Sequence, residues 1–136
     1  MANGKIKADT LEHSTAGALD TQYVVNGSSK FWIALNGSGT PTAFDSLNVG
    51  SITDVGTGNY RFNFGSNFSV AKGYWTTGCA AYEDDHDGAW VKHCMPMQDD
   101  DVLTSSLEIS VTYTSSSSTG DFDYTYVNMA GLGDLA

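Results

Sequence analysis

The sequence is poor in basic residues, in proline and in long hydrophobic runs. Six Lys and Arg face 16 Asp and Glu, for a formal net charge of −10, and 136 residues include two prolines. Because an acidic surface repels phosphate groups, we expect no binding to nucleic acid. The longest apolar run, residues 31–35, is far shorter than the roughly 20 residues that span a bilayer, so we expect no membrane insertion. Met1 is followed by no apolar export signal, so we expect folding in a cytoplasm.

The short motifs of common enzyme classes are also missing. The sequence contains no G-x-S-x-G, no H-E-x-x-H and no P-loop. Its paired carboxylates fall in polar runs that are typical of loops. We therefore expect a protein that is not an enzyme, with a small glycan-active enzyme as the outside alternative.

Helical periodicity is absent as well, and strand patterns take its place. Apolar and polar residues alternate at Tyr60, Phe62 and Phe64, with Arg61 and Asn63 between them, which puts the three rings on one face of a strand. Further strands are expected at residues 30–36, 47–54, 73–82, 89–94, 107–114 and 122–129. Glycines at turn-like spacings separate these segments. The sequence predicts an all-β fold: a single antiparallel β-sandwich, jelly-roll-like or barrel-like, of seven to eight short strands.

Two regions are expected within the chain. Residues 1–29 are polar and irregular apart from the apolar stretch 23–25, which predicts an N-terminal arm. Residues 30–136 hold the predicted strands and form the β-sandwich domain. This length is typical of one domain with its own core.

An acidic turn is the candidate cation site. Asp84, Asp85 and Asp87 lie close together in the sequence, and Ca²⁺ prefers such clustered oxygen ligands. The spacing matches no EF-hand, and a plain solvated loop is the alternative. We expect no cofactor other than this candidate calcium ion.

Four aromatic residues flank this turn. Aromatic rings beside carboxylates often bind carbohydrates. The candidate receptor-binding residues are therefore Tyr74, Trp75, Tyr82 and Trp90. The alternative is that the rings fill the core or a subunit interface, as most large aromatic side chains do.

The two cysteines lie on either side of the same turn. If the turn caps a hairpin centred near His86, Cys79 and Cys94 fall almost opposite one another, which allows a cross-strand disulfide. Two buried thiols are the alternative expected after assembly in a cytoplasm. A zinc site that adds His86 and His93 is a third reading.

Several short motifs follow one another in a characteristic order. They are Phe31-Trp32, Asn36-Gly37-Ser38-Gly39-Thr40, Ser46-Leu47-Asn48-Val49-Gly50-Ser51-Ile52-Thr53-Asp54, Gly56-Thr57-Gly58-Asn59-Tyr60 and Asn63-Phe64. This series resembles a recurrent β domain of bacteriophage tail-fibre and related virion proteins. The opening segments 4–11, 14–17 and 24–28 are similar to the start of short members, so the resemblance covers residues 4–80. Trp32 is expected to join the aromatic strand in the core.

The resemblance implies a bacteriophage virion structural protein, a homotrimer that serves in a tail fibre or spike for host attachment. A capsid decoration or head-fibre protein is the alternative, with residues 1–29 as a virion anchor. Implied partners are the other copies of the chain, other phage virion proteins and a host cell-surface glycan. The implied location is the virion, after assembly in the host cytoplasm.

Overall fold

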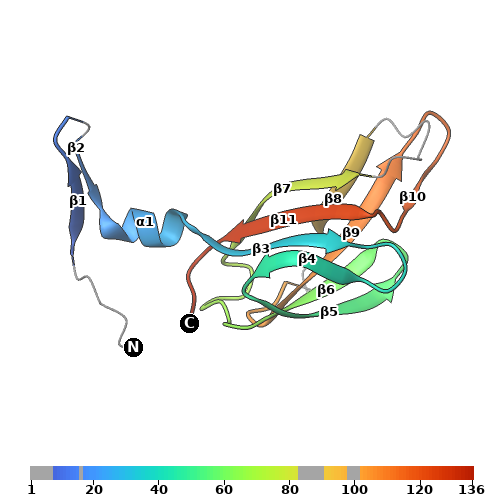
Figure 1. Ribbon diagram of the computed structural model, residues 1–136, viewed down its shortest axis with the longest axis horizontal. Coiled ribbons are helices and arrows are strands. Elements are labelled where there is room, and N and C mark those ends of the chain that lie inside the picture. Colours follow the sequence, from blue (N-terminus) through green and yellow to red (C-terminus); the bar gives the residue numbers. More distant parts are fainter. Residues whose placement is uncertain (1–7, 16, 83–90, 98–101) are drawn as a thin grey trace.

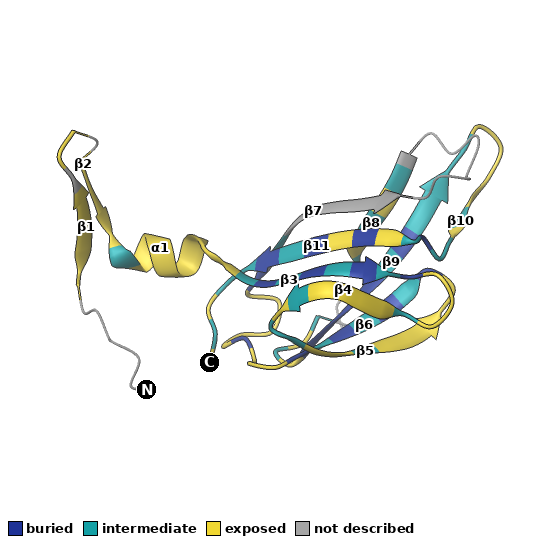
Figure 2. Cartoon of the chain, in the orientation of Figure 1, coloured by how far each residue is buried: buried dark blue, intermediate teal, exposed yellow. Residues whose placement is uncertain are grey.

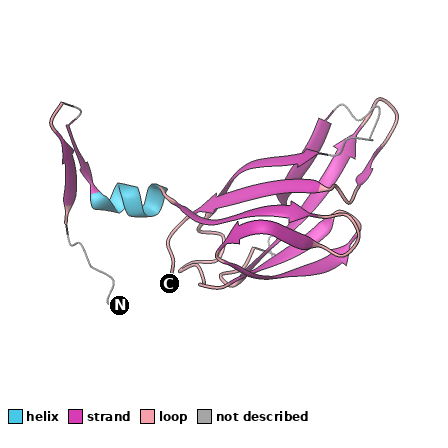
Figure 3. Cartoon of the chain, viewed as in Figure 1, coloured by secondary structure: helices cyan, strands magenta, loops and turns pink. Residues whose placement is uncertain are grey.

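The computed structural model describes residues 8–15, 17–82, 91–97 and 102–136, without the side chains of residues 13, 75, 77–82 and 91. Eleven strands and one helix lie in these ranges. They are β1 (Thr10–His13), β2 (Gly17–Asp20), α1 (Thr21–Gly27), β3 (Ser29–Asn36), β4 (Thr42–Leu47), β5 (Val49–Gly56), β6 (Asn59–Phe64), β7 (Trp75–Tyr82), β8 (Val91–Pro96), β9 (Ser106–Thr114), β10 (Thr119–Asp121) and β11 (Tyr126–Leu132). The prediction of an all-β fold is confirmed (Figures 1 and 3).

Two antiparallel sheets form a sandwich. The four-stranded sheet has the order β4-β3-β11-β7, and the five-stranded sheet has the order β10-β9-β6-β5, with β8 also paired to β9. A separate two-stranded hairpin, β1–β2, stands with α1 at one end of the sandwich (Figure 1). The region expected to be irregular, residues 1–29, therefore contains regular elements between residues 10 and 27.

The core lies between the two sheets and is built by period-two alternation. On β6, Tyr60, Phe62 and Phe64 are buried, as predicted, while Arg61 and Asn63 are half-buried on the other side. The remaining core strands contribute Phe31, Ile33 and Leu35 from β3, Val127 and Met129 from β11, and Leu107, Ile109 and Val111 from β9. The expectation that Trp32 joins this core is wrong: Trp32 alternates with the buried residues of β3 and lies on the opposite face.

One predicted strand, residues 47–54, is divided between two sheets. Its first residue ends β4 in the four-stranded sheet, and residues 49–54 belong to β5 in the other sheet. Asn48 makes the change of direction with a φ of 57°, a left-handed conformation that asparagine tolerates better than most residues. Its side chain accepts a hydrogen bond from the Ser66 backbone N–H at 2.6 Å and donates one to the Ser66 carbonyl at 3.0 Å.

Gly58 closes the β5–β6 turn in a position that a side chain cannot occupy. Its φ is 68°, and a Cβ there would lie 2.5 Å from the Val111 carbonyl oxygen. We expect Gly58→Ala to lower the free energy of unfolding by about 2 kcal/mol, from left-handed strain and this backbone overlap. Urea unfolding followed by circular dichroism measures the loss. Gly27→Ala is the matched control, because no atom lies within 4 Å of its Cβ position; an unchanged urea midpoint for Gly58→Ala would contradict the assignment.

Candidate interaction surfaces

Tyr74, one of the four candidate receptor residues, is a core residue. Its side chain is 7% exposed, and its ring stacks on Phe68 with centroids 4.1 Å apart. The hydroxyl lies 3.1 Å from the Leu103 carbonyl oxygen and 3.2 Å from that of Ser106. Burial raises the pKa of Tyr74 to about 12. The prediction that Tyr74 binds a receptor is therefore wrong for this conformation, and the alternative reading, a ring that fills the core, is the one observed.

The other candidate receptor and calcium residues cannot be placed in the same way. Trp75 and Tyr82 are the first and last residues of β7, but their side chains lie outside the described set. Trp90, Asp84, Asp85 and Asp87 lie outside the described residues. Among the residues that are described, no group of three or more His, Cys, Asp or Glu is arranged to hold a metal ion. Receptor binding by the three remaining aromatic residues and calcium binding stay predictions.

Cys94 on β8 is disulfide-bonded, so the alternative of two buried thiols is wrong; Cys79, on β7, is the other cysteine of the sequence. Among the described residues, β7 and β8 lie close together but do not pair as the expected hairpin. β7 pairs with β11 in the four-stranded sheet, whereas β8 pairs with β9 in the five-stranded sheet. A bond between these two strands would therefore cross the sandwich from one sheet to the other.

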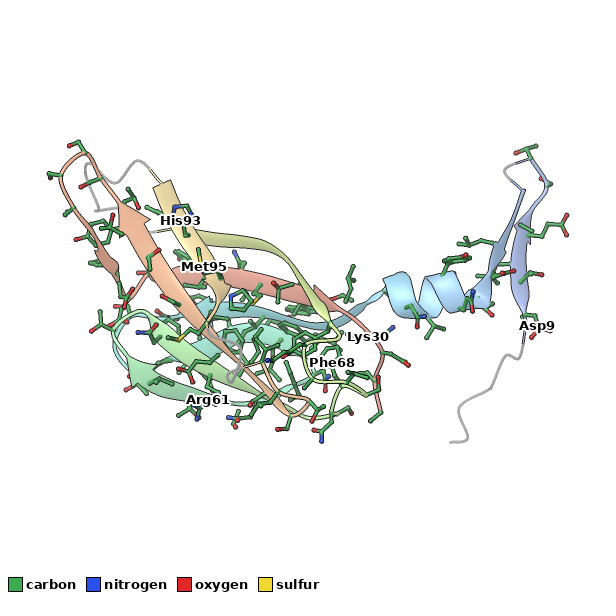
Figure 4. All side chains as sticks on the ribbon, turned by 180° about the vertical axis from the view of Figure 1, so that it is seen from behind. Asp9, Lys30, Arg61, Phe68, His93 and Met95 are labelled. Carbon is green, nitrogen blue, oxygen red and sulfur yellow. The ribbon has the colours of Figure 1, made fainter. Side chains whose placement is uncertain are left out.

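The outer surface of the five-stranded sheet is polar, and its side chains bond to one another. Arg61 Nη2 lies 2.5 Å from Glu108 Oε2, and the Glu108 side chain is only 6% exposed (Figure 4 labels Arg61). Asn63 donates to the hydroxyl of Ser51 at 3.0 Å and to that of Thr53 at 3.3 Å. Polar side chains on this surface therefore find hydrogen-bond and ion-pair partners on the same surface.

On the outer surface of the four-stranded sheet, the described side chains include a group of apolar residues beside Asp45 and Asn128. Trp32 and Leu47 are direct neighbours across β3 and β4, so both face outward, and Ala130 lies beside Trp32 on β11. Phe44 stacks on Tyr126 with ring centroids 5.3 Å apart and an interplanar angle of 22°. We call this surface the aromatic face and define it by Trp32, Ala34, Phe44, Leu47, Tyr126 and Ala130.

The aromatic face is open to solvent in the isolated chain. Phe44 is 55% exposed, and Leu47 and Tyr126 are each 46% exposed. Figure 2 shows β4 as a mostly exposed strand along this side of the sandwich. Of the described carboxylates, strand pairing places Asp45 here, opposite Ala34. Exposed apolar patches of this kind mark interaction sites on soluble proteins.

A second exposed apolar surface lies on the N-terminal segment. We call residues 8–28 the arm; its described residues are exposed, apart from the half-buried Thr21 (Figure 2). Five apolar side chains on it are 40–61% exposed: Leu11, Leu19, Tyr23, Val24 and Val25. A two-stranded hairpin and a seven-residue helix are each marginal in water on their own. The arm is thus an apolar, weakly self-supporting element that extends away from the sandwich (Figure 1).

Hydrogen bonds fix the arm to itself and to the start of β3. The Thr21 N–H donates to the Asp9 carbonyl at 2.8 Å, which ties α1 to the hairpin. At the other end, the Ser28 N–H donates to the Val24 carbonyl at 3.1 Å, and Lys30 Nζ donates to the Ser28 hydroxyl at 2.6 Å. Figure 4 shows Lys30 at this junction and Asp9 at the far end of the arm. These bonds tie α1 to the hairpin and to the start of β3, and Figure 1 shows the arm extending away from the sandwich.

Comparison with protein-family models, with curated proteins and with solved structures gives no match for this chain. No helix in the described ranges is long and apolar enough to cross a membrane. A functional proposal therefore depends on the arm, the aromatic face and the motifs of residues 4–80.

Proposed function

We propose that this chain is a bacteriophage virion structural protein, a homotrimeric component of a tail fibre or spike that serves in host attachment. The observation that carries the proposal is the arm: five exposed apolar side chains on a segment that projects from a compact sandwich. Such a segment suits a protein that works inside a larger assembly. The motif series of residues 31–64 supports the phage context by resemblance.

A trimer multiplies weak contacts to a host surface. Three sandwiches held together would bind a cell-surface glycan with avidity that one copy lacks. Trp75, Tyr82 and Trp90 are the aromatic residues proposed for that glycan, and Asp84, Asp85 and Asp87 are the ligands proposed for a calcium ion beside it. The net charge of −10 favours solubility of the free protein.

A capsid decoration or head-fibre role is the second candidate. It is favoured by the position of the arm at one end of the sandwich (Figure 1), because an arm anchored in a capsid would hold the sandwich clear of the surface. In this case the arm binds other virion proteins.

Immunogold electron microscopy distinguishes the two roles. Antibodies raised against the purified full chain are applied to phage particles from a lysate in which mass spectrometry finds this chain. Gold at tail tips is the result expected for a fibre or spike, and gold over the head is expected for decoration. Chain that stays in the soluble fraction, with no label on any particle, would overturn the virion assignment; serum depleted with the purified chain is the control.

A further inference from the structure

We infer that Asn26 is a self-modification site, at which the folded chain converts its own asparagine into aspartate and isoaspartate, while Asn36 in the same dipeptide is protected. The sequence holds three Asn-Gly pairs, at residues 3–4, 26–27 and 36–37. The first pair lies outside the described residues. The other two share the same local chemistry and differ in their surroundings, so the fold decides which of them reacts. This modification is independent of the proposed function.

The reaction needs no partner other than water. The Gly27 backbone nitrogen bonds to Cγ of Asn26, the Cγ–Nδ2 bond breaks, and the Gly27 N–H proton leaves with the side-chain nitrogen as ammonia. Water then opens the cyclic imide: its hydroxyl adds to Cγ to give aspartate, or to the main-chain carbonyl carbon of Asn26 to give isoaspartate, and its other proton returns to the Gly27 nitrogen. Glycine in the second position favours the first step, because it has the greatest backbone freedom and no Cβ to hinder the attack.

Asn26 lies in a part of the arm that opens at little cost. A helical N–H donates to the carbonyl four residues earlier, so α1 must open before the Gly27 nitrogen can react. This helix has seven residues and none of them is buried, and its N-cap residue, Asp20, makes no side-chain capping hydrogen bond. Helices this short are marginal in water. No described atom lies within 4 Å of a Cβ built on Gly27, so the opened peptide is free to turn toward the Asn26 side chain.

Asn36 is held by bonds that belong to the sandwich. The Gly37 N–H, which would have to attack, donates to the Tyr124 carbonyl at 2.9 Å, and the Gly37 carbonyl accepts a bond from the buried Tyr60 hydroxyl at 3.0 Å. The Asn36 side-chain oxygen accepts a bond from the Ser38 N–H at 3.0 Å. Gly37 is itself buried. Its nitrogen is therefore released only when this end of the sandwich opens, which is a rarer event than the opening of α1.

The product changes the junction between the arm and the sandwich. Either product adds one negative charge to a chain whose formal net charge is −10. Isoaspartate also lengthens the backbone by one carbon, since the chain then runs through Cβ and Cγ, and the helical ladder cannot continue regularly across it. The bond from the Ser28 N–H to the Val24 carbonyl spans residue 26. The conversion therefore loosens the base of the arm and leaves the core of the sandwich unchanged.

Peptide mass spectrometry of the full chain, after incubation at pH 8, measures both sites in one molecule. Trypsin cleaves after Lys7, Lys30 and Arg61, so Asn26 and Asn36 fall on separate peptides. Incubation in heavy-oxygen water marks the conversions that precede digestion, and fragment spectra locate them and separate isoaspartate from aspartate. The same measurement on the chain unfolded in guanidinium chloride gives the reactivity of each site without structure.

In the folded chain, Asn26 is expected to convert at least about 10-fold faster than Asn36, because its opening is local and the other is not. In the unfolded chain the two rates are expected to be similar. Equal rates at the two sites in the folded chain, or protection of Asn26 by folding as strong as that of Asn36, would overturn the inference.

The variant Gly27→Ala tests the route of the reaction. Its side chain hinders attack by the backbone nitrogen, so conversion at Asn26 is expected to slow at least about 10-fold, as glycine loses its special freedom. Asn36 in the same molecule is the internal control, and its rate is expected to stay as in wild type. An undiminished rate at Asn26 in this variant would exclude the cyclic imide and overturn the assigned self-modification.

Discussion

Replacing Phe31 with alanine is expected to lower the free energy of unfolding by about 4 kcal/mol, within the range for large-to-small changes in a core. Phe31 is fully buried, and its ring lies 5.0 Å from that of Phe64, 6.2 Å from Phe68 and 6.5 Å from Tyr74, between centroids. The surrounding rings belong to residues 64–74, the end of β6 and the segment that follows it, and they could close over the cavity only if this backbone moved. The space would remain, and the lost contacts would not be replaced.

Urea unfolding of the full chain measures this loss as a shift of the midpoint at constant slope. Val70→Ala is the control, because this side chain is 61% exposed and its truncation opens no cavity. We expect the control to change the free energy by less than about 0.5 kcal/mol, as surface substitutions do. A loss below about 1.5 kcal/mol for Phe31→Ala would mean that the aromatic cluster is loosely packed or differently arranged.

Raising the pH to 11.5 is expected to remove about 4 kcal/mol of stability through Tyr60 and Tyr74. Burial raises the pKa of Tyr74 to about 12. Burial, and then the hydrogen bond from the Tyr60 hydroxyl to Asp123 at 2.8 Å, raise the pKa of Tyr60 further. An unfolded tyrosine ionises near pH 10, so the unfolded state loses its proton first as the pH rises. The stabilisation is complete below pH 10 and declines by about 1.4 kcal/mol per pH unit for each tyrosine up to its folded pKa.

Urea unfolding at pH 8, 10 and 11.5 tests the pH dependence. Tyr74→Phe should reduce the decline at pH 11.5 by about 2 kcal/mol, because one ionising group is gone. Tyr23→Phe is the matched control, since this ring is 61% exposed on the arm, and its pH profile should follow that of wild type. Equal stability at pH 8 and 11.5 in wild type would contradict the burial of both hydroxyls.

The inward face of the core strands was predictable wherever alternation was uninterrupted. Tyr60, Phe62 and Phe64 are separated by polar residues, so the sequence shows which face of this strand turns toward the core and which turns away from it. β3 gave no such signal, because residues 31–35 are apolar on both faces of the strand. The misplacement of Trp32 follows from this, and the same unbroken run is the sequence signal of an apolar outer surface.

Features that depend on the order of the strands in the sheets could not be predicted from local sequence patterns. Tyr74 is buried because Phe68, six residues earlier, and Phe31, on the distant strand β3, pack beside it. The hairpin expected around Cys79 and Cys94 failed for the same reason, since β7 and β8 find partners in different sheets. Asn48, which divides one expected strand into two, could have been suspected from its tolerance of left-handed backbone.

The direct passage from α1 into β3 has a mechanical consequence. A pull applied to the arm enters the sandwich along β3, which is hydrogen-bonded on both sides, to β4 and to β11. Bonds of antiparallel pairs lie perpendicular to the strands, so a load along β3 shears both ladders at once instead of unzipping them one bond at a time. A chain tethered by its arm would thus meet tension at a strand that is hydrogen-bonded on both sides.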